Sequence, residues 1–140
     1  MSLVFPDVNV WLALASDEHT QRRAALAWWR PNNVQIGFCR VTQMGLLRLL
    51  TTAAVMNGRP LSMKEAWKAY DGFFSDERVE FLAEPPAVER AFRGLSSSVH
   101  ASPKLWADAY LTAFANECGG SIVTFDRSLA RRGRNSVFLQ

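Results

Sequence analysis

The sequence predicts an α/β fold in which a central, mainly parallel sheet of about four to five strands is flanked by helices on both faces. Two observations lead to this prediction. Short apolar stretches alternate with longer segments of helical periodicity, and nearly every short stretch is continuously apolar, as expected for strands buried on both faces. Ligands of such sheets bind beyond the carboxyl ends of the strands, so the residues that follow the strands are the first candidates for a site.

Apolar periodicity and helix-stop residues set the expected bounds of each element. Strands are expected at residues 2–5, 34–38, 79–82, 121–125 and 137–139. Helices are expected at residues 7–16, 19–30, 40–52, 62–74, 85–95, 103–118 and 128–132. Ser102 is expected to cap the sixth helix, with Pro103 at its first position, and Gly119 to end it.

Length and composition indicate one globular domain, residues 1–140, because 49% of the residues are hydrophobic and 21% charged. No apolar run reaches the roughly 18 residues of a membrane span and no signal peptide is evident, so a cytoplasmic protein is expected.

Cys39 and Cys118 form no motif and are expected to be buried, reduced thiols. The net charge is +3, and all but three of the 16 cations are arginine, which suits a polyanionic partner.

Three acidic residues stand in unusual surroundings. Asp7 ends the first apolar strand, Asp126 ends the fourth, and Asp108 lies inside an otherwise apolar helix. A carboxylate in such surroundings must be paired or must bind a cation. We therefore expect the three to meet and to hold a divalent ion, and oxygen ligands favour Mg²⁺, or Mn²⁺, over Zn²⁺. A purely structural role for Asp7, as the N-cap of the following helix, is the alternative.

Other phosphate chemistries fit the sequence less well. The chain has no G-x-x-x-x-G-K-[ST] loop. Phosphatases of the haloacid-dehalogenase type require Asp-x-Asp at the end of the first strand, where this chain has Asp7 and Asn9. A ribonuclease that uses two histidines could be built only from His19 and His100, both of which are expected at the surface.

Three segments, Phe5-Pro-Asp7-Val-Asn9, Trp106-Ala-Asp108-Ala-Tyr and Val123-Thr-Phe-Asp126-Arg, resemble the main motifs of PIN-domain proteins, in particular the VapC toxins of type II toxin–antitoxin modules. The resemblance extends over almost the whole chain. It implies a Mg²⁺-dependent endoribonuclease that a VapB-type antitoxin inhibits and that commonly dimerises. It also implies that Asp7, Asp108 and Asp126 are the metal ligands, and that Asn9 and Thr124 orient the site.

The sequence departs from this family at Gln43, which occupies what looks like the place of a further glutamate. An amide adds no negative charge, so metal affinity is in question, and an ordinary polar helix residue is the alternative.

Arg40, Lys104 and Arg127 flank the motifs and are candidates to hold RNA phosphates, or are plain surface cations. Trp106 could stack a base, although a core position is expected. Two helices carry aromatic residues that either form a groove for an antitoxin helix or pack in the core: Trp28, Trp29, Phe73 and Phe74.

In the expected mechanism, the ion lies between Asp7 and Asp108, and Asp126 orients the attacking water, which leaves a 5′-phosphate and a 3′-hydroxyl. Two other functions stay open. One is a PIN-like module that binds RNA or protein without cutting, which Gln43 would favour. The other is a metal-dependent phosphatase of small phosphoesters, which the asparagine at position 9 disfavours.

Overall fold

A five-stranded parallel sheet forms the centre of the computed structural model, which describes residues 2–140. The strand order is β3-β2-β1-β4-β5, and all four strand pairings are parallel. The strands are β1 (Leu3–Pro6), β2 (Gln35–Phe38), β3 (Val79–Phe81), β4 (Ser121–Thr124) and β5 (Val137–Phe138). The predicted α/β class and the predicted number of strands are confirmed.

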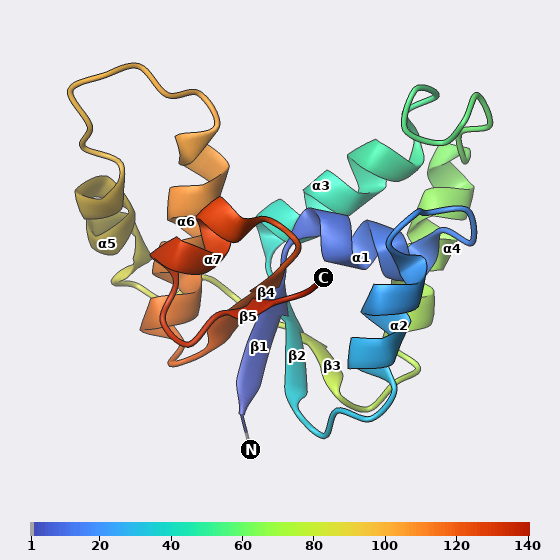
Figure 1. The fold of residues 1–140 in the computed structure, drawn as a ribbon, viewed down its shortest axis with the longest axis horizontal. Helices are drawn as coiled ribbons and strands as arrows, with labels where there is room; N and C mark the ends of the chain where they lie inside the picture. Colours follow the sequence, from blue (N-terminus) through green and yellow to red (C-terminus); the bar gives the residue numbers. More distant parts are fainter. Residues whose placement is uncertain (1) are drawn as a thin grey trace.

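Seven helices, counted over residues 2–140, cover the two faces of this sheet, as predicted (Figure 1). On one side lie α1 (Val8–Ala15), α2 (Arg22–Trp29), α3 (Arg40–Leu50) and α4 (Met63–Phe73). On the other lie α5 (Val88–Leu95), α6 (Leu105–Glu117) and α7 (Arg127–Arg132). The helices lie in the connections between consecutive strands. Because these strands are parallel, each connection must cross a face of the sheet. No helix in the described part of the chain has the length and apolar character needed to cross a membrane.

Aromatic side chains fill the core beneath α1, α2 and α4. The fully buried ring of Trp11 stacks on Phe38 with centroids 3.7 Å apart and meets Trp29 and Phe73 edge to face. Phe74 stacks on Phe38 from a centroid distance of 5.8 Å. The aromatic residues of α2 and α4 that the sequence left open, Trp28, Trp29, Phe73 and Phe74, therefore pack against this core and do not form a free groove.

A second core lies under α5 and α6. Phe5 of β1 and Phe114 of α6 meet edge to face at 5.4 Å, and both are essentially inaccessible to solvent. Cys39 is buried in this core, as expected, and Cys118 is only half-buried beside it; both thiols are free. The two cores make α6 and β1 fixed supports, and both carry acids at their ends.

The order of the strands creates a point at which a ligand can bind. From β1 the chain moves to β2 on one side, whereas β4 and β5 lie on the other, so the order reverses between β1 and β4. Pro6 pairs with Val123 across these two strands, and the backbone N–H of Asp7 donates to the carbonyl of Val123 (2.9 Å). The residues that follow β1 and β4 therefore emerge side by side at the switch point.

The start of α6 differs from the prediction. The helix begins at Leu105 and not at Pro103, and its N-cap is Lys104, which offers no side-chain hydrogen bond. Ser102 instead contributes its carbonyl, which accepts from the Leu105 N–H (3.0 Å) in a turn that precedes the helix. The end is as predicted: Gly119 has a φ of 69°, a conformation that glycine adopts without strain.

Candidate metal centre at the ends of β1 and β4

Asp7 is a buried carboxylate that is held in place from two directions. It is the N-cap of α1, where its Oδ1 accepts from the backbone N–H of Val10 (3.1 Å), and its Oδ2 accepts from the hydroxyl of Thr124. Only 8% of the residue is exposed. Burial raises the pKa of Asp7 above its ordinary value, while the hydrogen bonds from Thr124 and Val10 oppose that rise. The capping role that the sequence offered as an alternative is real, and it fixes the direction of the carboxylate.

Thr124 connects two of the predicted site residues. Its side chain is fully buried at the end of β4. The oxygen that donates to Asp7 also accepts from the backbone N–H of Asp126 (2.9 Å). One hydroxyl therefore sets both the orientation of the Asp7 carboxylate and the path of the chain into Asp126, which gives a physical basis to the orienting role expected from the resemblance.

Asp126 caps the short helix α7. Its Oδ1 accepts from the backbone N–H groups of Ser128 (2.8 Å) and Leu129 (3.3 Å). The residue is exposed, and its Oδ2 accepts no hydrogen bond from residues 2–140. The helix end thus presents one carboxylate oxygen to solvent in a fixed direction.

Asp108 lies on the first turn of α6 and is half-buried. Burial raises its pKa, the negative charge of Asp126 raises it further, and the positive charge of Arg132 opposes the rise. The charge of Asp108 in turn contributes to the raised pKa of Asp7. The structure therefore brings Asp108 within electrostatic reach of both other acids.

None of the three acids forms an ion pair with a lysine, arginine or histidine of residues 2–140. Nor do any three or more histidine, cysteine or acidic side chains in this part of the chain gather into a group that could hold a metal. The donor set nevertheless fits Mg²⁺, because this ion is usually held by one or two carboxylates and keeps several waters. Hard oxygen donors that form no ion pair within residues 2–140 supply that chemistry.

Asn9 and Gln43 contribute differently from the acids. Asn9 is exposed on the first turn of α1, and its backbone N–H helps to lower the pKa of Asp7. Gln43 is buried on α3, where its Oε1 accepts from Arg40 (2.7 Å), and its side chain acts to lower the pKa of Tyr70 on α4. The polar groups of Gln43 are therefore engaged by α3 and α4 and not by the three acids.

The cations expected to hold RNA are all exposed, and none of the three forms an ion pair within residues 2–140. Arg40 lies over the ring of Phe81 (4.7 Å) and Arg127 over that of Phe138 (4.9 Å). Lys104 stands at the start of α6, the helix that carries Asp108. These three positions flank the acids without neutralising them.

Sequence reasoning missed Arg132, the cation whose charge acts on Asp108. Arg132 lies in the last turn of α7, the helix that Asp126 begins. No signal in the sequence could have found this residue, because the direction of α7 relative to α6 is set by tertiary packing.

Trp106 is also placed differently from the expectation. The prediction put this residue in the core, but 60% of it is exposed. The two histidines lie far apart, His19 in the loop between α1 and α2 and His100 in the loop between α5 and α6, on opposite sides of the sheet (Figure 1). A catalytic pair of histidines is therefore excluded.

Comparison with known proteins identifies the family of the chain. Residues 4–135 match the PIN domain family. The chain is 42% identical over 133 residues to Ribonuclease VapC41 of Mycobacterium tuberculosis (strain ATCC 25618 / H37Rv), with 91% of each chain covered. It is 31% identical over 132 residues to Ribonuclease VapC44 of the same strain, covering 89% of this chain and 86% of the relative.

The fold is shared with a solved structure, that of Mycobacterium tuberculosis VapC20, described as a sarcin-ricin loop cleaving toxin. The TM-score is 0.69 at 16% sequence identity, with 96% of this chain and 98% of that chain covered. The chain therefore belongs to the PIN-domain family. Within this family its sequence groups with the VapC ribonucleases.

Proposed function

We propose that this chain is the toxin of a type II toxin–antitoxin system and acts as a Mg²⁺-dependent endoribonuclease. Its similarity to VapC ribonucleases supports the activity. The observation that carries the metal dependence is the junction of β1 and β4. There a single threonine hydroxyl holds Asp7 and Asp126, Asp108 lies within electrostatic reach, and no basic side chain of residues 2–140 is ion-paired with any of the three.

In this proposal Asp7 and Asp108 hold the ion, directly or through water. When bound, Mg²⁺ (or Mn²⁺) would offset the charge that develops on a phosphoryl oxygen and favour ionisation of a bound water. The free Oδ2 of Asp126 accepts a hydrogen bond from the attacking water and orients it. In-line attack on an RNA phosphodiester then leaves a 5′-phosphate and a 3′-hydroxyl. The hydroxyl of Thr124 directs the Asp7 carboxylate, and both this hydroxyl and the backbone N–H of Asn9 favour its ionised form.

Substrate binding is assigned to cations around the acids. Arg40, Lys104 and Arg127 are exposed and would contact RNA phosphates, and Arg132, whose charge acts on Asp108, would add a further phosphate contact. Phosphate contacts position a nucleic acid but do not read its sequence. Cytoplasmic RNA is the proposed substrate.

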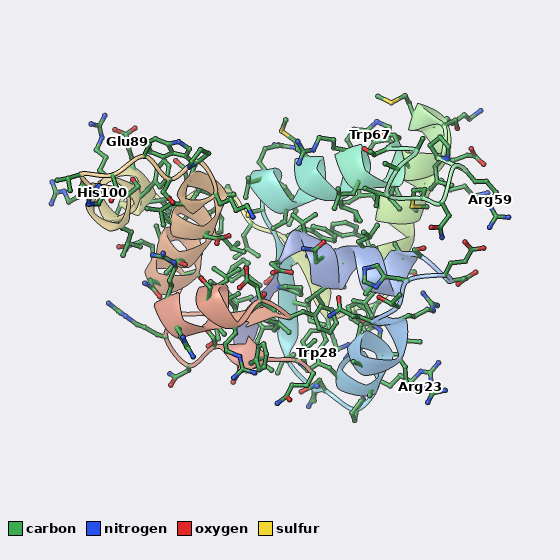
Figure 2. All side chains as sticks on the ribbon, turned by 45° about the horizontal axis from the view of Figure 1, so that its top comes forward. Arg23, Trp28, Arg59, Trp67, Glu89 and His100 are labelled. Atoms are coloured by element: carbon green, nitrogen blue, oxygen red, sulfur yellow. The ribbon has the colours of Figure 1, made fainter. Side chains whose placement is uncertain are left out.

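Protein partners are proposed from the same family membership: a VapB-like antitoxin and a second copy of the chain. A hollow between α3 and α4 supports a partner, because its lining is largely apolar and includes Met44 (61% exposed), Met63 (74%) and Trp67 (46%). Exposed apolar patches of this kind often mark protein interfaces. Trp67 points outward from this side of the molecule (Figure 2).

One specific observation favours a second candidate, a PIN-like module that binds RNA without cutting it. The polar groups of Gln43, at the place of the family's further glutamate, are already used by Arg40 and Tyr70. A chain with fewer charged ligands would bind the ion more weakly. Incubation of the pure protein with structured RNA separates the two functions, since fragments that EDTA prevents indicate the nuclease and retention without fragments indicates the binder.

The decisive experiment sequences RNA 5′ ends after a brief pulse of expression in cells, beside an Asp7→Ala control. New 5′ ends that the wild-type chain produces and the variant does not would support the proposal and identify the target. Identical 5′ ends in both cultures, with equal amounts of folded protein, would reject it.

A further inference from the structure

The exposed indole of Trp106 has no structural partner that accounts for it. Trp106 stands on the first turn of α6 with 60% of its surface exposed, and its one aromatic contact within residues 2–140 is an edge-to-face contact with Phe92 at 6.1 Å. Most large aromatic residues of the chain are buried or half-buried. A flat ring left open on the helix that carries Asp108 is therefore a feature of the surface and not of the core.

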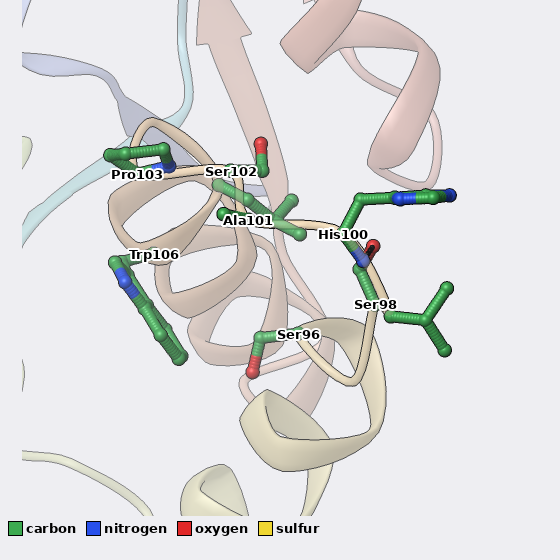
Figure 3. A pocket seen from close by; sticks show the side chains of 9 residues that line it. Ser96, Ser98, His100, Ala101, Ser102, Pro103 and Trp106 are labelled. Carbon is green, nitrogen blue, oxygen red and sulfur yellow. Dashed lines mark hydrogen bonds between the residues drawn. The ribbon is translucent and has the colours of Figure 1, made fainter.

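Trp106 lines two hollows. One, of about 310 Å³, is lined by the loop between α5 and α6 and the start of α6. Its lining includes Ser96, Ser98, His100 and Ser102, and the indole of Trp106 and the imidazole of His100 point away from each other at its two ends (Figure 3). The other, of about 570 Å³, lies between Trp106, Phe92 and Tyr110. A planar group could therefore lie against the indole.

The lining of the first hollow suits a neutral ligand with hydrogen-bonding edges. No carboxylate, lysine or arginine lines it. The side chains of Ser102 and His100 make no hydrogen bond within residues 2–140, and Ser98 Oγ only accepts, from the backbone N–H of His100 (3.2 Å). Hydroxyl and imidazole groups are thus free to donate and to accept. A phosphate group would find no charged partner here, whereas the edge of a heterocycle would.

The second hollow contains three charged side chains. Glu89 forms an ion pair with Arg93 (3.0 Å), which offsets both charges, whereas Glu84 accepts the neutral hydroxyl of Tyr110 and keeps its negative charge. This hollow therefore suits a neutral base better than a phosphate. Lys104, two residues before Trp106 and in no ion pair within residues 2–140, adds a positive charge at the start of α6.

We propose that Trp106 and the loop of residues 96–104 form a binding site for one unpaired base of the RNA substrate, stacked on the indole. This inference rests on the proposed function. Residues two apart on a helix point about 200° apart, so Trp106 and Asp108 leave α6 on opposite sides. The stacked base belongs to a nucleotide that neighbours the cut one, and the strand passes over the start of α6. Unpaired bases splayed onto aromatic side chains are the usual target of sequence-specific RNA recognition.

The test compares RNA binding by Trp106→Ala, Trp106→Phe and the unchanged chain, each in an Asp108→Asn background that keeps the RNA intact. The probe is a fluorescein-labelled single-stranded RNA containing all four bases, and the same RNA in duplex form. Trp67→Ala is the matched control, because Trp67 is also exposed but lies on α4, on the other side of the molecule from the loop (Figures 1 and 2). Thermal melting establishes that each variant is folded.

Loss of one base–aromatic stack weakens binding by roughly tenfold, so Trp106→Ala should bind single strands about tenfold more weakly while Trp106→Phe and Trp67→Ala stay close to the parent. Duplex binding should change little. Unchanged single-strand binding in Trp106→Ala, an equal loss in Trp67→Ala, or no recovery with phenylalanine would each overturn the inference. If Trp106→Ala does not fold, the fluorescence of 2-aminopurine in the RNA decides instead. The parent should quench this fluorescence, and a Trp106→Leu variant should lose more of the quenching than Trp106→Phe does.

A separate cleavage assay tests the proposed function itself. The chain with Asp108 intact is incubated with the same RNA and Mg²⁺, and an absence of cleavage there would reject the nuclease without affecting the binding comparison. Cleavage that persists while Trp106 proves irrelevant to binding would reject only the stacking site.

Discussion

The hydroxyl of Thr124 donates a hydrogen bond to the carboxylate of Asp7, a residue 117 positions away in the sequence. The same oxygen accepts from the backbone of Asp126 (2.9 Å). Parallel pairing of β1 with β4 makes this contact possible, because it places the ends of two distant strands next to each other. The arrangement leads to four predictions about the chain.

Thr124→Val should weaken both the fold and the activity. Valine has nearly the same shape but removes the donor to Asp7 and the acceptor for Asp126, which leaves a buried carboxylate short of a hydrogen bond. Such losses cost about 1–3 kcal/mol in the free energy of unfolding. Support groups of metal ligands typically contribute about 10–100-fold to affinity or activity, so RNA cleavage should fall by that factor. Thr124→Ser keeps the hydroxyl and should retain most of both; equal losses in the two variants would contradict the hydrogen-bond explanation.

Asp108→Asn should abolish cleavage and leave the protein folded. The change removes a charge that burial and Asp126 already disfavour, and no ion pair is lost within residues 2–140. Electrostatic contributions of several kcal/mol correspond to a loss of about a thousandfold in rate. Urea denaturation should show equal or greater stability. Asp71→Asn, on an exposed position of α4, is the matched control and should cleave RNA normally. Normal cleavage by Asp108→Asn would remove this residue from the site.

The contribution of Asp7 and Asp108 to stability without metal should fall as the pH rises from the acid range to neutrality. The pKa values of Asp7 and Asp108 are both raised in the folded state, mainly by burial. The folded state therefore holds these protons more tightly than the unfolded chain, whose aspartates titrate near pH 3.9. The favourable contribution is complete below that pH and is lost as the pH rises through the raised pKa values.

Urea denaturation in EDTA across this range measures the effect. Other carboxyl groups, such as that of Asp76, have lowered pKa values and act in the opposite direction. The difference between wild type and Asp108→Asn isolates the site, and the variant should lose less stability than the wild type as the pH rises. Parallel curves for the two proteins would mean that Asp108 does not have a raised pKa.

Mg²⁺ should stabilise the wild-type chain at neutral pH. An ion present at a hundred times its dissociation constant adds about 2.7 kcal/mol to the free energy of unfolding, which for a chain of this size raises Tm by about 8 °C. EDTA should reverse the shift, and Asp108→Asn should reduce it strongly. At acid pH protons compete for the carboxylates, so the shift should shrink. An identical shift with monovalent salt at equal ionic strength would indicate nonspecific screening.

Much of the fold could be read from local pattern. Continuous apolar strands, helical periodicity and the glycine stop at Gly119 depend on neighbours in the sequence, so they identified the α/β class and nearly all elements. The starts of three helices were exceptions: α2 begins at Arg22 and not at residue 19, α5 at Val88 and not at residue 85, and α6 at Leu105 and not at residue 103. Ser102 and Pro103 carry the residue types of a helix start, but the chain makes a turn there and the helix begins only at Leu105. Local preference at helix ends is worth about 1 kcal/mol, which loop packing can override.

The sequence by itself determined which carboxylates stand at strand ends and in the apolar helix, because those positions follow from the alternation of strands and helices. Only the tertiary structure decided that Thr124 holds Asp7 and Asp126 together and that the charge of Arg132 acts on Asp108. It also decided that Gln43 accepts a hydrogen bond from Arg40 and acts on Tyr70, and that Trp106 is exposed to solvent. The physical reason is that a local pattern specifies what a residue prefers, whereas strand order and helix packing specify which distant groups it meets.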